Sequence, residues 1–205
     1  IRLQRRLACK MGAWLDKAHV VDGLPIPVCQ FARAHFSKCF RGEAAYGHCE
    51  AKKQVYYGFR GHLLITLDGL ITSFALTKAN TDEREAVWDL LADVQGTLIG
   101  DKGYLCQTLQ QELAGYGIDL QTPKRSNMHD ARDPRYVRKL TSMRRRIETV
   151  IGQLCERFHI EKVRAKDTWH LVSRIARKLL SHTVSLLINH NLGRPLLQLD
   201  GLLMA

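Results

Sequence analysis

Three acidic residues stand in sequence settings that suit a chemical role as well as a structural one. Asp22 follows the apolar run "AHVV", Asp101 follows "TLIG", and Glu148 lies two residues after three consecutive arginines. Carboxylate oxygens are the ligands that Mg²⁺ prefers, and two such ions about 4 Å apart can activate an attacking oxygen and stabilise a leaving one. Three acids of this kind are what a magnesium-dependent phosphodiester site requires.

Each of these acids also has a structural interpretation. Asp22 and Asp101 precede turns that contain glycine, where an aspartate often accepts a hydrogen bond from its own backbone. Glu148 lies four residues after Arg144, the spacing of an intrahelical ion pair that is worth only a few tenths of a kcal/mol. Judged one at a time, the structural roles of the aspartates are the commoner ones, and both kinds of role stay open at this point.

The periodicity around Glu148 predicts a long amphipathic helix over about residues 135–159. Its apolar positions recur at intervals of three and four and form one buried stripe: Leu140, Met143, Ile147, Val150, Ile151, Leu154 and Phe158. Glu148 follows Ile147, about 100° round the helix, at the border of this stripe. Gly152, one turn later, costs roughly 1 kcal/mol against alanine inside a helix, so we expect a neighbouring group to need the space.

Strand patterns alternate with helix patterns along the chain. Strands are predicted at residues 18–22, 54–67, 70–77, 96–101 and 118–123, and helices at 79–94, 105–117, 135–159 and 168–191. Gly23, Pro25 and Pro27 are expected to end the first strand, and Asp68-Gly69 is expected to turn a hairpin. Ligands of open α/β sheets collect where strands end, so Asp22 and Asp101 are expected to share one rim of a central sheet.

Three other residues are rivals for a place in the site. Asp82 competes with Asp101 as the second acid, but an acid at the start of the 79–94 helix favours the helix dipole, so we expect a capping role beside an N-cap at Asn80 or Thr81. Asp68 is expected to be a turn residue. His62, on a predicted strand, is expected to be a packed or exposed histidine rather than a site residue.

The charge of the chain favours a polyanionic partner. The 205 residues include 31 Lys and Arg against 20 Asp and Glu, a formal charge of +11. Nine basic and two acidic side chains fall within residues 124–146, a pattern that suits nucleic acid although a solvated basic face is the commoner reason for such a run. The sequence contains no apolar run of eighteen residues, so no membrane span is expected.

Three parts of the chain are expected. Residues 1–17 are helical and basic without a long apolar core, and they are expected to be the leftover of an upstream module rather than a signal peptide. Residues 18–195 are expected to form the catalytic domain and residues 196–205 a C-terminal tail. The six cysteines form no CxxC pair, which favours reduced thiols over disulfides or a zinc cluster at Cys39, His48 and Cys49.

Four stretches together resemble a known family. "VVDGLPIPVC", "YYGFRGHLLITLDGLITSFALTKANTDEREAV", "LIGDKGYL" and "RRRIETVIGQL", in this order, resemble the DDE transposases of bacterial insertion sequences, in particular the group whose first Asp lies in a DS(F/L)PxPVC-like stretch. The resemblance runs from about Asp22 to the last helix. It implies an RNase H-like fold, a mixed five-stranded sheet flanked by helices, and an enzyme of the bacterial cytoplasm associated with the nucleoid. It also implies that the upstream module, of which residues 1–17 are expected to be the remnant, is a helical DNA-binding segment.

The resemblance assigns roles residue by residue. The family's three acids fall on Asp22, Asp101 and Glu148, which implies catalytic ligands for two Mg²⁺ ions, with Mn²⁺ as a substitute. Lys102 and Tyr104 fall beside the second acid, and Arg144 falls one helical turn before the glutamate, so these are expected to contact the DNA backbone. Four further basic residues are expected to bind DNA: Lys124, Arg125, Arg145 and Lys162.

The sequence departs from the family pattern at four positions. Gly23 stands where the group often has serine, and Gly61 where a larger apolar residue is usual. Thr141 replaces a tyrosine, and Cys155 replaces a basic residue seven positions after the glutamate. These departures bear on the DNA contacts more than on the three acids.

The resulting hypothesis is a transposase that cleaves double-stranded DNA at the ends of an element and joins them to a target, working as a homo-oligomer because two ends must meet. Two rivals remain open. One is a hydrolytic nuclease of the same fold, which cuts without joining. The other is a non-catalytic DNA-binding remnant of a decayed element, which binds DNA with steep salt dependence and cuts nothing.

Overall fold

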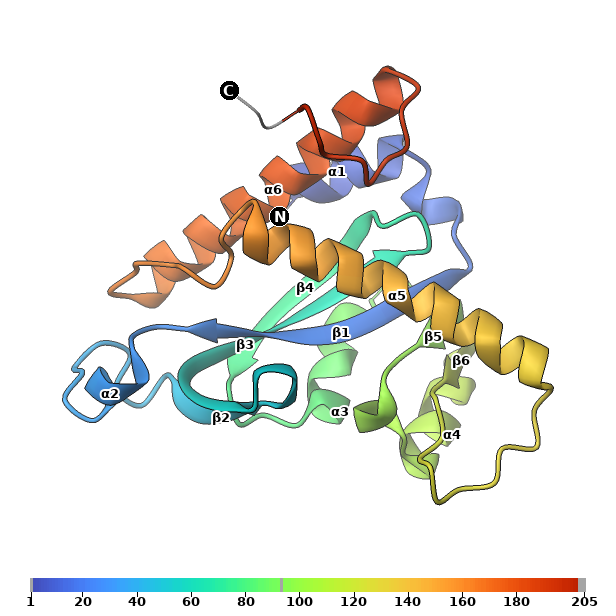
Figure 1. The fold of residues 1–205 in the computed structure, drawn as a ribbon, viewed down its shortest axis with the longest axis horizontal. Coiled ribbons are helices and arrows are strands. Elements are labelled where there is room, and N and C mark those ends of the chain that lie inside the picture. The colour runs from blue at the N-terminus through green and yellow to red at the C-terminus, as the bar shows by residue number, and fades with distance from the viewer. Residues whose placement is uncertain (1, 93, 203–205) are drawn as a thin grey trace.

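The computed structural model describes residues 2–92 and 94–202 and places one mixed sheet among helices (Figure 1). The strands are β1 (Ala18–Pro27), β2 (Ala45–Cys49), β3 (Gln54–Thr66), β4 (Ile71–Lys78), β5 (Gly96–Ile99) and β6 (Ile118–Gln121). The α-helices are α1 (Arg2–Lys10), α2 (Phe31–Ala34), α3 (Glu83–Ala86), α4 (Gln107–Gly115), α5 (Pro134–Glu156) and α6 (Thr168–Asn191). Short 3₁₀ turns are η1 (Ala13–Leu15), η2 (Glu50–Lys52), η3 (Val87–Leu90) and η4 (Lys102–Tyr104).

The sheet confirms the predicted mixed α/β class. Its strands follow the order β2-β3-β1-β5-β6, and β4 pairs with β3. The β1–β3, β2–β3 and β3–β4 pairs are antiparallel, whereas β1–β5 and β5–β6 are parallel. The sheet has six strands rather than the five expected, because the short strand β2 was not predicted. The β3–β4 hairpin turns through Gly69 with φ +89°, as predicted from the Asp-Gly pair.

Two cores lie on opposite faces of this sheet because neighbouring residues of a strand point to opposite sides. On β1, Val20 packs with α5 and α6, whereas Val21 packs with η3 and α4. On β3, Leu63 packs in the same core as Val20, and Leu64 packs in the same core as Val21. Figure 1 shows α5 crossing one face of the sheet diagonally, which brings the middle of this helix over β1 and β5.

Strand β1 runs beyond the point where the sequence predicted its end. It pairs with β3 as far as Pro27↔Gly58, but with β5 only as far as Val20↔Ile99. The N–H of Val28 bonds to β3. Because successive N–H groups of a strand point to opposite sides, the nitrogens of Pro25 and Pro27, which carry no hydrogen, point away from β3, to the edge where β5 no longer pairs. Proline is tolerated in a strand on such an unpaired edge, and therefore the prediction of a strand break at residues 23–27 was wrong.

The two long helices begin at aspartate caps. Asp133 accepts a hydrogen bond from Arg135 N at 2.7 Å before α5, and Asp167 accepts one from His170 N at 2.9 Å before α6. Helix α5 ends three residues earlier than predicted. Of its predicted stripe, Leu140, Ile147, Val150 and Leu154 are buried, and Met143 and Ile151 are partly buried against the same core.

Helix α1 packs on the body of the domain rather than standing apart from it. It lies against α6 and β4, and Gln4 Nε2 donates to Ile71 O at 2.5 Å and to Thr183 Oγ1 at 3.3 Å. The domain limits at residues 17 and 195 stay predictions. Residue 1 and residues 203–205 of the predicted terminal segments lie outside the described residues. None of the described helices has the length and apolar character needed to span a membrane.

Candidate active site

Asp22 and Asp101 lie side by side because of the register between two parallel strands. Val20 of β1 is level with Ile99, the last residue of β5, and each aspartate comes two residues later. Asp22 is therefore inside β1, where that strand has lost its β5 neighbour, and Asp101 is in the loop that follows β5. The pairing brings together two acids that are far apart in the sequence.

Both aspartates also make the turn-type hydrogen bonds that their sequence settings allow. Asp22 Oδ1 accepts from Gly23 N at 2.7 Å, and Asp101 Oδ1 accepts from Gly103 N at 2.7 Å as the N-cap of η4. A carboxylate has two oxygens and about four lone-pair positions, so one backbone bond does not use up its capacity as a ligand. The structural and the chemical interpretation of each aspartate are therefore compatible.

The surroundings of Asp22 make its ionised form costly. Burial raises the pKa of Asp22 to about 7, with further contributions from the neighbouring charges of Asp101 and Glu83. The hydrogen bond from Gly23 N and the positive charge of Arg144 act in the opposite direction. A group of carboxylates that repel one another in a poorly solvated place is stabilised by a cation among them.

Glu148, on helix α5, is paired with Arg144, an arginine whose charge acts on Asp22. Arg144 Nη2 donates to Glu148 Oε1 at 2.8 Å, the intrahelical ion pair that the sequence spacing allowed. The Glu148 side chain is 54% exposed, whereas that of Arg144 is 29% exposed and close enough to Asp22 to lower its pKa. Within residues 2–92 and 94–202, no three His, Cys, Asp or Glu side chains stand ready to hold a metal ion in this conformation. The structure thus brings the two aspartates together and leaves Glu148 bound to Arg144.

Sequence reasoning missed a fourth acid, Glu83. It is the first residue of α3, and Arg60 Nη1 of β3 donates to its Oε1 at 2.7 Å, with both side chains 21% exposed. Asp82, the rival weighed from the sequence, accepts from Arg84 N at 2.9 Å and forms an ion pair with the Arg84 side chain. Asp82 is the N-cap of α3, so the predicted capping role is confirmed, and the expected N-cap at residue 80 or 81 was wrong.

The donor set fits a hard divalent cation. Every acid near Asp22 offers carboxylate oxygens, the ligand type that Mg²⁺ and Mn²⁺ accept, and no thiol or imidazole is among the groups that perturb Asp22. The raised pKa of Asp22 and the mutual repulsion of these acids are the features that a bound cation relieves.

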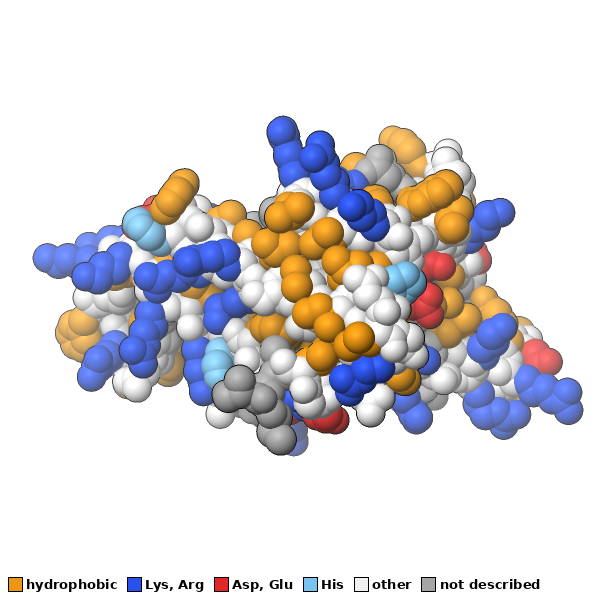
Figure 2. Space-filling model, turned by 90° about the horizontal axis from the view of Figure 1, so that it is seen from above, with side chains coloured by type: hydrophobic (Ala, Val, Ile, Leu, Met, Phe, Trp, Pro, Cys, Tyr) orange, Lys and Arg blue, Asp and Glu red, His pale blue; other side chains and the backbone are white. Residues whose placement is uncertain are grey.

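Most of the residues predicted to bind DNA are on the surface. The exposed ones are Lys102, Lys124, Arg125, Arg145 and Lys162. Figure 2, a view from above, shows Lys and Arg side chains gathered at the end of the molecule where α6 begins. Tyr104 requires a correction, because its side chain is 0% exposed in the core between β5 and α4 and offers no surface to DNA.

Two expectations about other residues have opposite outcomes. A Cβ at Gly152 would meet nothing within 4 Å, so no neighbouring group of the described chain needs the space, and that prediction was wrong. His62 is a packed histidine, as expected: it is buried, its Nε2 lies 2.9 Å from Thr77 Oγ1, and burial lowers its pKa to about 4. All six cysteines are free.

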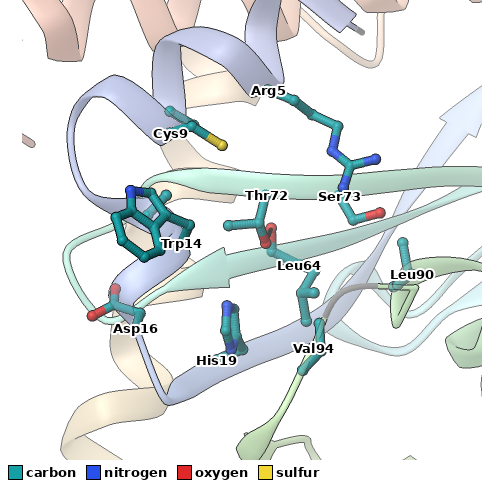
Figure 3. A pocket seen from close by; sticks show the side chains of 12 residues that line it. Arg5, Cys9, Trp14, Asp16, His19, Leu64, Thr72, Ser73, Leu90 and Val94 are labelled. Carbon is teal, nitrogen blue, oxygen red and sulfur yellow. Dashed lines mark hydrogen bonds between the residues drawn. The ribbon is translucent and has the colours of Figure 1, made fainter.

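A pocket of about 290 Å³ lies apart from the acids, where α1 and η1 meet β1 and β4. Its lining includes Trp14, Asp16 and His19, which Figure 3 shows around the same space. Asp22, Asp101 and Glu148 do not line it, so we place the candidate site at the carboxylates and not at this cavity.

Comparisons with known proteins agree with the fold and identify a family. Residues 13–168 match the profile of the family described as "Transposase DDE domain". A similar solved structure is described as "Cryo-EM structure of piggyBac transposase synaptic complex with hairpin DNA (SNHP)", with a TM-score of 0.51 and 11% sequence identity. The likeness covers 86% of this chain and 48% of that one, so this chain spans about half the length of that protein. No curated protein matches the sequence.

Proposed function

We propose that this chain, which belongs to the transposase DDE domain family, cleaves DNA at the ends of a transposable element and joins the freed ends to target DNA. Water attacks the phosphodiester at the end of the element, the P–O3′ bond breaks, and a 3′-hydroxyl is released. That hydroxyl then attacks a target phosphate: a new P–O3′ bond forms, the target's own P–O3′ bond breaks, and the target 3′-oxygen leaves as a hydroxyl, with no covalent protein–DNA intermediate.

The observation that carries this proposal is the register of β1 against β5. It sets Asp22 and Asp101 next to each other, and the match to residues 13–168 includes both acids and Glu148. These three residues hold two Mg²⁺ ions in the proposal, and Mn²⁺ is the substitute. When bound, the ions lower the cost of the negative charge that develops on the attacking and leaving oxygens.

Glu148 joins the aspartates by leaving Arg144. The pair connects residues one helical turn apart, and the glutamate side chain is 54% exposed. Exposed pairs of this kind are worth about 0.3–0.5 kcal/mol, which a divalent cation readily outweighs. A side-chain rotation then turns Glu148 toward the ions and leaves the Arg144 guanidinium free to hold a DNA phosphate beside the acids.

The remaining parts of the proposal concern the partners. Double-stranded DNA lies along the exposed basic residues, with Lys102 directly after Asp101 and Arg145 on the same helix as Glu148. A homo-oligomer brings two element ends together. The enzyme belongs to a bacterial insertion sequence and acts in the cytoplasm, at the nucleoid.

Replacing Glu148 by glutamine tests the proposal. Glu148→Gln keeps the shape of the side chain but removes its charge, and we expect cleavage of element-end DNA in Mg²⁺ to fall by about a thousandfold or more while DNA binding stays within twofold. Glu156→Gln, an exposed glutamate at the end of the same helix, is the matched control and keeps wild-type activity.

Three outcomes separate this function from its rivals. Loss of binding together with cleavage in Glu148→Gln contradicts the ligand role. Wild-type protein that cuts but transfers no strand is a nuclease of this fold. Wild-type protein that binds DNA in a strongly salt-dependent way and cuts nothing in Mg²⁺ or Mn²⁺ is a DNA-binding remnant.

A further inference from the structure

The Glu83 carboxylate lies beside two glycines, Gly23 and Gly103, that follow the two aspartates in the sequence. A Cβ built on Gly23, the residue after Asp22, would lie 3.1 Å from Glu83 Oε1. A Cβ built on Gly103, two residues after Asp101, would lie 2.8 Å from Glu83 Oε2 and 2.9 Å from Asp101 Oδ1. Oxygens of Glu83 and Asp101 thus flank one point in space, which is open because residue 103 has no side chain.

The Glu83 carboxylate fits here because residues 23 and 103 have no side chains. Serine at position 23, which the resembled family group often has, would press its Cβ against Glu83 Oε1 and the stem of Arg60. Glycine there is a departure from that pattern, and the structure gives it a reason: the space is filled by the carboxylate of Glu83. That carboxylate comes from a helix that packs against η4, the turn directly after Asp101.

A buried hydroxyl lies near the same acids. Tyr104 is 0% exposed, its ring packs against Gly100 after β5, and within residues 2–92 and 94–202 its hydroxyl has no hydrogen-bond partner. Burial raises the pKa of that hydroxyl well above its ordinary value, and the charges of Glu83, Asp22 and Asp101 raise it further, so the hydroxyl lies in the neighbourhood of the three carboxylates. A buried hydroxyl of this kind needs a hydrogen-bond partner, and a water bound to a cation would be one.

We propose that Glu83 is a fourth carboxylate of the metal centre, which binds a divalent cation beside Asp22 and Asp101, directly or through one water, and that Arg60 is the internal cation it exchanges for that metal. This inference rests on the proposed function, because it assumes that the aspartates hold a cation. The Tyr104 hydroxyl faces the hydration shell of that cation.

Two separate hydrogen bonds of the Arg60 guanidinium suit it to this exchange. Its Nη1 binds Glu83, while its Nη2 donates to His48 O at 3.0 Å, so the guanidinium stays anchored when the carboxylate turns away. A cation that neutralises Glu83 in the empty site competes with the metal for the same oxygens. Removing Arg60 and removing the charge of Glu83 therefore have opposite effects on metal affinity.

Direct titration of Mn²⁺ into the metal-free chain tests the inference without using activity. Calorimetry on Glu83→Gln should give an affinity about 10- to 100-fold below wild type, because one carboxylate of the centre is lost. Arg60→Gln should bind Mn²⁺ several-fold more tightly. Asp82→Asn, the neighbouring acid that only caps α3 and pairs with Arg84, should bind as wild type does.

The folding of each variant is checked by its far-ultraviolet circular dichroism and melting curve. Glutamine at position 83 can still accept a hydrogen bond from Arg60, so the fold should persist. If it does not, Glu83→Asp keeps the charge on a side chain one methylene shorter and should give an intermediate affinity.

The outcomes distinguish this inference from the proposed function. Equal Mn²⁺ affinity in wild type and Glu83→Gln, with Asp22→Asn strongly weakened, overturns the role of Glu83 and leaves the function standing. Loss of affinity in Arg60→Gln as large as that in Glu83→Gln also overturns it, because the pair is then only a structural brace. Wild-type protein that binds no Mn²⁺ overturns the function itself.

Discussion

Two regions of this molecule gather charges of one sign, and they do so in different ways. The acidic centre consists of Asp22, Asp101 and Glu83, short side chains that strands and turns fix in a partly buried place. The basic pocket, at the start of α6, is lined by Lys162, Val163, Arg164, Arg174, Arg177 and Lys178. No acid is among these lining residues.

The two regions differ in how deeply their charged groups are buried and in the length of their side chains. In the acidic centre burial raises the pKa of Asp22 to about 7, so the ionised carboxylate is costly there, and in the proposed function a small cation would relieve this cost. In the basic pocket long side chains stand at the surface, and Lys178 Nζ and Arg174 bond to backbone carbonyls of Phe158 and Arg164. The comparison teaches that short, desolvated charges suit a small ion, whereas several long cationic side chains spread over a surface suit an extended anion such as a DNA backbone.

The largest effect on stability is expected from the buried member of the acidic centre. The folded-state pKa of Asp22, about 7, lies above the ordinary value of 3.8, so the folded protein holds more protons than the unfolded chain between these values. Stability from this group is therefore present at low pH and is lost as pH rises toward 7. In EDTA, Asp22→Asn should be more stable than wild type at pH 8, by on the order of 2 kcal/mol more than at pH 5.

Urea unfolding at the two pH values measures this difference. His62 and His182, whose pKa values burial lowers to about 4, act with the opposite sign in both proteins, and the comparison of variant with wild type cancels their effect. Asp119→Asn, at an exposed carboxylate, is the control and should show no such pH dependence. An equal gain at pH 5 and pH 8 would mean that Asp22 is not the desolvated acid of the centre.

A smaller effect is expected from the basic pocket, and it should appear in DNA affinity rather than in stability. Arg174→Gln combined with Arg177→Gln removes two charges near the surface, so affinity for duplex DNA at 0.1 M salt should fall by about 10-fold, with a shallower salt slope by about two. Arg157→Gln is the control, because Asp200 already neutralises that arginine. Fluorescence anisotropy over a salt series makes the measurement, and an unchanged slope would show that DNA does not bind at this pocket.

The long elements of the fold could be predicted from local periodicity. Helices α5 and α6 and the β3–β4 hairpin repeat their apolar pattern over many residues, and they are where the sequence placed them. Strand β2 was missed because its residues are half-buried or exposed and carry no clear apolar alternation. Strand β1 was cut short because the rule that proline breaks strands depends on which edge is paired, and only the register with β5 settles that.

The candidate site was predictable only in part, for the same reason. Asp22 and Asp101 each follow an apolar strand, a local signal, and the pairing of β1 with β5 makes them neighbours. Glu83 has no such signal, because an acid in the first turn of a helix is explained by the helix dipole. Its position beside Gly23 and Gly103 depends on tertiary structure, which residue spacing along the chain does not reveal.

The smallest effect is expected at Arg144, a cation beside the acidic centre. It pairs with the exposed Glu148 and acts on Asp22, so in the metal-free protein it partly neutralises the acidic centre. Arg144→Gln should change the free energy of unfolding by no more than about 0.5 kcal/mol at pH 7, because an i,i+4 pair this exposed is weak and the loss of one favourable charge beside Asp22 is met by uptake of a proton. Lowering the pH to 5, where Asp22 is already protonated, should shrink even this difference. A loss of several kcal/mol in urea unfolding would show that Arg144 is a buried structural brace, and Glu148 would then not be free to turn toward the aspartates.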